Sequence, residues 1–225
     1  NPFDDLRIAN VGRDATTRKT PSALELKAIA AAFDQDDSLP ALIIRIQLGT
    51  GTRIAEIAGL GLDDVVLDGD TPHIRIRPRS WRTLKTEASQ RDVPLVGIAL
   101  EAAKRAAALA KGKSALFPRY AQERGPDTAS ATINKRLKPW GITSHGFRHG
   151  MKDLLREVDC PEPLQREIQG HSLNDPADGY GKGPSLAKKA EWLTKALALV
   201  TSATDKSGAK ASSPSPVEAA SEVPA

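Results

Sequence analysis

The sequence has little cysteine and few aromatic residues. Its single cysteine, Cys160, leaves no partner for a disulfide within the chain and no basis for a metal site built from cysteines. A chain that makes no use of disulfides fits a reducing compartment, so we predict a cytoplasmic location. Aromatic residues make up only 4% of the chain, but hydrophobic residues together reach 40%, which is enough for one domain with its own core.

Long hydrophobic runs are also absent. No apolar stretch approaches the roughly 20 residues that a membrane-spanning helix requires, so we expect no membrane partner. No signal peptide opens the sequence, and its first residue is Asn1 instead of a methionine. We therefore expect a piece of a longer protein, with a further domain upstream.

The formal net charge is +4, and the positive excess is concentrated in one segment. Between residues 73 and 91, six cationic side chains are opposed by one acidic side chain, Glu87, which gives a local net charge of +5. Such density favours contact with the phosphates of a nucleic acid. A solvated strand face would show the same pattern, and charge alone does not separate the two interpretations. The six cations are Arg75, Arg77, Arg79, Arg82, Lys85 and Arg91.

Helical patterning dominates the chain, with one group of strands near its middle. Ser22 followed three residues later by Glu25 matches a capping box, which predicts a helix over 22–34. Alternation over 73–77 places Ile74 and Ile76 on one face of a strand. The strands predicted beside it are 65–67 and 91–95. The other predicted elements are helices at 40–48, 53–60, 97–111, 127–138, 144–158, 161–170 and 185–200, with a Gly/Thr turn at 49–52 and Ser144 as an N-cap.

These elements predict a mainly α fold with a small antiparallel β-sheet (α+β). We expect residues 1–20 to form an irregular lead-in and residues 21–200 to form the domain. Residues 201–225 contain mostly Ser, Ala, Pro, Lys and Glu, with almost no large apolar side chain, so we predict a disordered tail there.

Five side chains suited to phosphate chemistry occupy informative positions. Arg53 begins a predicted helix, where its guanidinium and the helix N-terminus could meet at one anion. His145 and Arg148 stand three residues apart on a predicted helix and therefore share a face. His171 follows a predicted helix end, and Tyr180 lies nine residues further on with a glycine on either side. Taken singly, each has an ordinary alternative: a surface ion pair, a structural histidine or a buried tyrosine.

Three of the four histidines lie between residues 145 and 171, which raises the alternative of a metal site. His145 and His149 have a spacing that zinc sites use. However, the glutamate of a His-Glu-x-x-His motif is missing between them, and no cysteine is near. We therefore predict neither a metal nor another cofactor.

In order along the chain, these residues form a series of short motifs that resembles one known family. The resemblance covers roughly residues 22–197 and is to the catalytic domain of the tyrosine recombinase (phage integrase) family. It implies that family's catalytic-domain fold and a core-binding domain upstream of residues 1–20. The motifs are Thr-Gly-Thr-Arg-Ile-Ala-Glu around Arg53, Leu84-Lys85-Thr86 leading to Arg91-x-Val93-Pro94-Leu95, His145-x-x-Arg148-His149, Gly170-His171-Ser172, and Tyr180.

The resemblance implies site-specific DNA recombination. Tyr180 would attack the scissile phosphate to form a 3′-phosphotyrosyl link, and a 5′-hydroxyl of a partner strand would then resolve that link. The implied partner is double-stranded DNA with a specific site, bound by a homotetramer on paired sites. The implied source is bacterial or phage-encoded, with association to the nucleoid. The helix at 185–200 either docks on a neighbouring subunit, as in the family, or packs on its own domain.

The resemblance also assigns roles to the remaining residues. Arg53 and Arg148 would bind the charge that builds on the phosphate oxygens in the transition state. Lys85 would be the general acid that protonates the leaving 5′-oxygen, with Arg82 as its rival. His145 would help to deprotonate the tyrosine, and His171 would donate to the phosphate or stabilise the transition state. For Glu56, three residues after Arg53, we expect a supporting structural role.

Three other functions are compatible with parts of this pattern. A type IB topoisomerase-like enzyme would use similar residues to relax DNA without a defined site. A catalytically inactive relative would bind DNA only. A helical scaffold for other proteins would leave the basic segment and the motif order unexplained, and salt-dependent DNA binding would distinguish it from the others.

Overall fold

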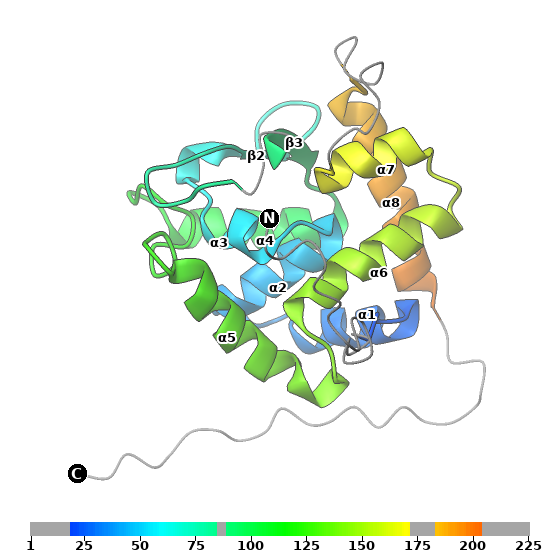
Figure 1. Cartoon of the computed structure of the whole chain (residues 1–225), viewed down its shortest axis with the longest axis horizontal. Helices are drawn as coiled ribbons and strands as arrows, with labels where there is room; N and C mark the ends of the chain where they lie inside the picture. The colour runs from blue at the N-terminus through cyan, green and yellow to red at the C-terminus, as the bar shows by residue number, and fades with distance from the viewer. Residues whose placement is uncertain (1–18, 85–88, 172–182, 204–225) are drawn as a thin grey trace, which may run out of the picture.

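Eight α-helices and a three-stranded sheet make up the described part of the chain (Figure 1). The computed structural model describes residues 19–84, 89–171 and 183–203. Lys85 and Tyr180, two of the predicted catalytic residues, lie outside these ranges, as do residues 1–18 and 204–225. The elements in chain order are α1 (Ala23–Ala32), α2 (Leu39–Thr50), α3 (Ile54–Ala58), β1 (Val65–Val66), β2 (His73–Ile76), β3 (Arg91–Pro94), α4 (Gly97–Leu109), α5 (Gly125–Leu137), α6 (Ser144–Glu157), α7 (Glu162–Gln169) and α8 (Leu186–Ser202).

Helix α2 lies at the centre of the core. Every residue from Ala41 to Thr50 is buried, and α2 contacts α1, α3, α4, α5, α6 and α8. Pro40 stands in its first turn, where a backbone N–H would have no partner within the helix. Gly51 ends α2 with a φ of +66°, and a side chain there would collide with Met151 of α6. This glycine therefore lets the end of α2 lie directly against α6.

The sheet is antiparallel in the order β1-β2-β3, with Ile74 opposite Val93. Ile74 and Ile76 are fully buried, whereas Arg75 between them is exposed, which confirms the predicted alternation. Strand β3 contacts both α7 and α8. The sheet therefore brings β3 beside the end of α7, where His171 follows.

The helix boundaries differ from the predicted ones where tertiary contacts intervene. Gly49 and Thr50, predicted to lie in a turn, belong to α2. Helix α4 packs closely against α2 at Gly49, where a Cβ would lie 2.7 Å from the Ala99 Cβ. The glycine therefore serves helix packing and not a turn. The predicted N-cap Ser144 is the first residue of α6, and Thr143 is the N-cap. The Ser144 N–H donates to the side-chain oxygen of Asn134 on α5 at 2.8 Å, so a neighbouring helix supplies the capping acceptor.

Helix α8 packs on its own domain. Leu193, Leu197 and Val200 are buried, and α8 contacts α1, α2, α6 and β3. It continues through Ser202, two residues into the segment predicted to be a tail. Within the described ranges, no helix combines the length and the apolar character that a membrane crossing requires.

Candidate active site

The end of α7 gathers three arginines from three other elements. Arg91 of β3 donates through Nε to the Ile168 carbonyl at 2.9 Å. Arg148 of α6 donates through Nη2 to the Gln169 carbonyl at 2.5 Å. Arg53, the N-cap of α3, donates through Nη2 to the Gly170 carbonyl at 3.4 Å. The last carbonyls of a helix lack partners within it and carry its negative dipole end, so this turn holds cationic groups in place.

Both the backbone conformation at position 170 and the side chains around it require a glycine there. Its φ of +63° lies in the left-handed region, and a side chain there would overlap the Arg91 guanidinium. The backbone N–H of His171 donates to the Arg166 carbonyl at 3.0 Å, which completes the helix ending. The backbone of His171 is therefore fixed directly beside the arginines.

Glu56 joins two of these arginines to each other. Its carboxylate accepts from the Arg53 backbone N–H and from Arg53 Nη1, each at 2.8 Å, and from the two Arg91 Nη atoms at 3.1 and 3.0 Å. Burial raises the pKa of Glu56, but the charge and hydrogen bonds of Arg91 and Arg53 outweigh burial and lower the pKa overall. Glu56 is thus a buried carboxylate that orients guanidiniums, as its expected supporting role implies.

Positive charge in this cluster exceeds negative charge. Among the described residues, the ion pairs of Arg53 and Arg91 both go to Glu56, and Arg148 has backbone carbonyls as its hydrogen-bond partners. Burial lowers the pKa of Arg148 to about 10, and the nearby charge of Arg53 adds to the effect. A buried cation without a counter-charge is stabilised by any anion that binds beside it. The arrangement is therefore suited to hold a phosphate.

His171 is neutral at neutral pH in this setting. Burial lowers its pKa to about 4, and the positive charges of Arg148 and Lys152 reinforce burial. A neutral imidazole keeps one N–H donor and one acceptor nitrogen. An anion bound at the arginines would offset the repulsion and raise this pKa.

His145 lies one turn before Arg148 in the first turn of α6. Its ring is exposed and packs edge-on against the His149 ring, with 4.7 Å between ring centroids. Arg148, by contrast, is only 5% exposed and points to the ends of α2 and α7 through Gly51 and Gln169. The structure therefore brings Arg53, Arg148 and His171 together, while His145 occupies the solvent side of the same helix.

The basic segment is less open to solvent than its charge suggests. Arg77 and Arg79 pair with Asp63 and Asp64, which precede β1; Arg77 Nε lies 2.5 Å from Asp64 Oδ1. Asp64 is fully buried, and although burial raises its pKa, hydrogen bonds from Arg79, the Gly61 N–H and Arg77 lower it overall. The local excess of positive charge is thus partly offset by acids that the sequence places outside the segment.

Of the other three arginines predicted to contact DNA, two have buried side chains and one is exposed. Arg82 is 4% exposed and donates to the backbone carbonyls of Glu56 and Arg77. The Arg91 side chain is only 6% exposed and belongs to the cluster described above. Arg75 on β2 is the member of this set that faces solvent.

Two residues near the site, Gln169 and Lys152, were not among the residues predicted from the sequence. Gln169 is buried, and its side chain donates to the Arg148 carbonyl at 2.9 Å. Lys152 stands one turn after Arg148 and near enough to His171 to affect its pKa. The helical spacing of Arg148 and Lys152 could have placed the lysine on the same face, but nothing local indicated Gln169.

Comparisons with known proteins agree with this arrangement. A family model described as the phage integrase family matches residues 22–177. The tyrosine recombinase XerC of Neisseria meningitidis serogroup B is 30% identical over 148 residues, and the tyrosine recombinase XerD of Corynebacterium glutamicum is 30% identical over 186 residues. These alignments cover 62% and 73% of this chain but only 46% and 58% of the two relatives, so the chain spans about half the length of each.

A solved structure shares the fold. The structure of the Tn1549 transposon integrase in complex with a circular intermediate DNA superposes with a TM-score of 0.59. The alignment covers 77% of this chain and 64% of that chain, at 19% sequence identity. At that identity the likeness shows a common fold, which is mainly helical with a small antiparallel sheet.

Proposed function

This chain belongs to the phage integrase family, and we propose that it cleaves and rejoins DNA at a specific site through a 3′-phosphotyrosyl intermediate on Tyr180. The observation that carries the proposal is the cluster at the end of α7, where Arg53, Arg91 and Arg148 each donate to a backbone carbonyl. Arg53 and Arg91 also share the Glu56 carboxylate. Such a cluster suits a phosphodiester, which gains charge on its non-bridging oxygens as it reacts.

Arg53 and Arg148 are the proposed phosphate ligands. Their guanidiniums are held before any substrate arrives, by Glu56 and by the α7 carbonyls, so little reorganisation is needed during reaction. Two planar guanidiniums can each offer paired donors to one phosphate. Arg91 stays bound to Glu56 and Ile168, and we assign it to positioning.

The remaining roles concern proton transfer. Neutral His171 would donate its N–H to the phosphate, and His145 would help to deprotonate Tyr180. Lys85 would protonate the leaving 5′-oxygen. The placement of Arg82 supports Lys85 over this rival, because Arg82 is buried and both of its Nη atoms already donate to carbonyls.

The proposed partner is double-stranded DNA with a specific site, bound by four copies of the protein on paired sites. Support comes from the structural likeness to the Tn1549 integrase, whose structure is a complex with DNA. Among the predicted DNA-contacting arginines, the exposed Arg75 is the strongest candidate for a phosphate contact. The salt-bridged Arg77 and Arg79 would have to exchange Asp63 and Asp64 for DNA.

A covalent trapping experiment tests the proposal. The protein is incubated with nicked duplexes that cover the DNA flanking its own gene, and an SDS-resistant protein–DNA adduct is sought. Wild type should form the adduct and Tyr180→Phe should not. Tyr120→Phe is the matched control, because Tyr120 is 1% exposed and its hydroxyl has no hydrogen-bond partner among the described residues. An adduct that persists in Tyr180→Phe and disappears in Tyr120→Phe would overturn the assignment.

The same assay distinguishes the remaining functions. If the protein binds DNA but no variant forms an adduct, even with any upstream domain present, then the chain is an inactive DNA-binding relative. Rapid relaxation of any supercoiled plasmid, without a preferred site, would instead indicate a topoisomerase-like enzyme.

A further inference from the structure

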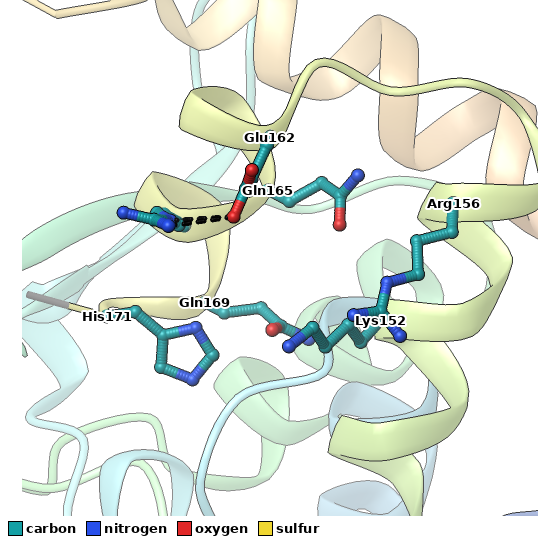
Figure 2. A pocket seen from close by; sticks show the side chains of 7 residues that line it. Lys152, Arg156, Glu162, Gln165, Gln169 and His171 are labelled. Carbon is teal, nitrogen blue, oxygen red and sulfur yellow. Dashed lines mark hydrogen bonds and ion pairs between the residues drawn. The ribbon is translucent and has the colours of Figure 1, made fainter. Parts of the chain in front are cut away.

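A basic pocket lies between α6 and α7, beside His171. Its volume is about 580 Å³. Figure 2 shows Lys152 and Arg156 projecting from α6 toward Gln165 and Gln169 of α7, with His171 at one side. The lining is almost entirely polar or charged, so the pocket suits a charged ligand better than an apolar one.

Among the described residues that line this pocket, Lys152 is the cation without an ion pair. Arg166 is paired with Glu162 at 2.8 Å. Arg156 lies 3.4 Å from Asp153, and both of these side chains are 59% exposed, so that pair contributes little and is easily exchanged. Within the described part of the chain, Lys152 forms no ion pair. The pocket therefore carries positive charge that an anion would neutralise.

The pocket is continuous with the proposed active site. Lys152 follows Arg148 by four residues on the same face of α6, which places their Cα atoms about 6 Å apart along the helix axis. Gln169 lines the pocket with its side chain, while its backbone carbonyl binds Arg148. Lys152 also acts electrostatically on His171. An anion in the pocket would thus lie next to one held by Arg148.

We propose that this pocket binds a DNA backbone phosphate adjacent to the cleaved phosphate, with Lys152 as its ligand. The inference rests on the proposed cleavage of DNA at Arg53 and Arg148. A DNA strand necessarily places further phosphates beside the one that reacts, and its regular charge spacing suits a row of cations along one helix face. Lysine has a flexible stem and a compact charge, which fits a contact to phosphate that does not take part in the chemistry.

The first test is the salt dependence of DNA binding. Lys152→Gln removes the charge, Lys152→Arg keeps it, and Lys104→Gln removes a charge from an exposed lysine of α4 that does not line the pocket. For Lys152→Gln we expect severalfold weaker binding and a plot of log association constant against log salt that is shallower by about 0.9. Lys152→Arg and Lys104→Gln should keep the wild-type slope. Equal thermal unfolding midpoints will show that the variants fold.

The second test locates the phosphate. Duplexes that carry a single neutral methylphosphonate, either at the cleaved phosphate or at one of the positions beside it, are bound to wild type and to Lys152→Gln. At one flanking position the methylphosphonate should weaken wild-type binding but leave Lys152→Gln unaffected, because the partner charge is already gone. Such non-additivity is the signature of a direct contact.

The outcomes separate this inference from the proposed function. If wild type forms the Tyr180 adduct while Lys152→Gln keeps the wild-type slope, then DNA cleavage stands and the phosphate contact is wrong. Additive effects at every flanking position also overturn the contact. If wild type forms no adduct, the salt slope on duplex DNA still decides whether Lys152 meets a phosphate. Lys152→Gln could instead give a shallower salt slope, with non-additivity only at the cleaved phosphate. That result would place Lys152 at the cleaved phosphate and contradict the proposed contact to a neighbouring phosphate.

Discussion

Arg148 and Gln169 bind each other through two reciprocal hydrogen bonds. The Arg148 guanidinium donates to the Gln169 backbone carbonyl at 2.5 Å, and the Gln169 side-chain amide donates to the Arg148 backbone carbonyl at 2.9 Å. The pair ties the buried face of α6 to the last turn of α7. His171 follows that turn directly. The pair therefore fixes Arg148, a proposed phosphate ligand, relative to His171, which is proposed to donate a hydrogen bond to the same phosphate.

Replacing Gln169 should loosen this connection. Gln169→Met keeps a side chain of similar length but removes the amide donor, and we expect the free energy of unfolding to fall by about 1 kcal/mol. Cleavage should also slow, because Arg148 and the α7 end lose a constraint. Urea unfolding and the rate of adduct formation are the measurements.

Gln165→Met is the matched control for this change. Gln165 is also a buried glutamine of α7, but its amide donates to the Cys160 carbonyl at 2.6 Å and not to Arg148. Gln165→Met should lose similar stability. Because Gln165 also lines the pocket between α6 and α7, the variant's cleavage rate is compared at saturating DNA, where it should equal that of wild type. Equal loss of rate in both variants would show that the Arg148–Gln169 pair has no special role.

Glu56→Gln should destabilise the protein strongly at neutral pH. The change leaves Arg53 and Arg91 without their shared carboxylate, and removing one partner of a buried ion pair typically costs about 3–5 kcal/mol. The folded-state pKa of Glu56 is lowered, so its stabilisation is present above the unfolded pKa and is lost as pH falls through the folded pKa. Urea unfolding at pH 7 and below pH 4.5 should therefore show wild type and variant converging in acid. A constant difference across this range would contradict the assigned ionisation.

His171 should titrate near pH 4 in the protein without DNA. Its folded pKa lies below the ordinary value of 6.5, so the unfolded chain binds more protons between these values. Its contribution to stability is complete above pH 6.5 and declines as the pH falls toward 4. Histidine NMR resonances followed against pH, with His171→Asn to assign the peak, will measure the pKa. Added sulfate or DNA should raise the pKa. A value near 6.5 without any anion would show that neither burial nor the nearby cations act on this ring.

Asp64→Asn should weaken the fold of the basic segment. Asp64 is fully buried and pairs with Arg77 and Arg79, so loss of its charge should lower the free energy of unfolding by about 3 kcal/mol. The neighbouring Asp63 pairs with the same arginines, but its side chain is 65% exposed, and Asp63→Asn should change stability by at most about 0.5 kcal/mol. Thermal unfolding of the two variants provides the comparison. Equal losses would show that burial of Asp64 is not what anchors the segment.

Local patterns in the sequence were sufficient for much of the fold. The Ser22–Glu25 capping box forms as predicted, and Ile74 and Ile76 alternate with exposed Arg75. Both features depend on residues within four positions of each other, where helix and strand geometry is nearly fixed by the backbone. The order of the chemical motifs was likewise readable, because it needs only residue identity and spacing.

Charge on the basic segment could not be judged in the same way. Counting along residues 73–91 omits Asp63 and Asp64, which lie 13 to 16 positions before the arginines that they pair with. Only the return of the chain through β1 and β2 brings them together. The burial of the Arg82 and Arg91 side chains could not be predicted for the same reason. An arginine is expected to be exposed unless its hydrogen-bond acceptors are known, and these acceptors lie far away in the sequence.

The sequence by itself determined the family, the mainly helical fold with one small sheet, and the set of groups able to act on a phosphate. The tertiary structure decided which of those groups meet. Arg91 reaches Ile168 across 77 positions and Arg148 reaches Gln169 across 21, and both contacts depend on the unpaired carbonyls at the end of α7. Hydrogen bonds of this kind depend on distances in space that no local pattern encodes, so the cluster became visible only once the helices and the sheet were packed.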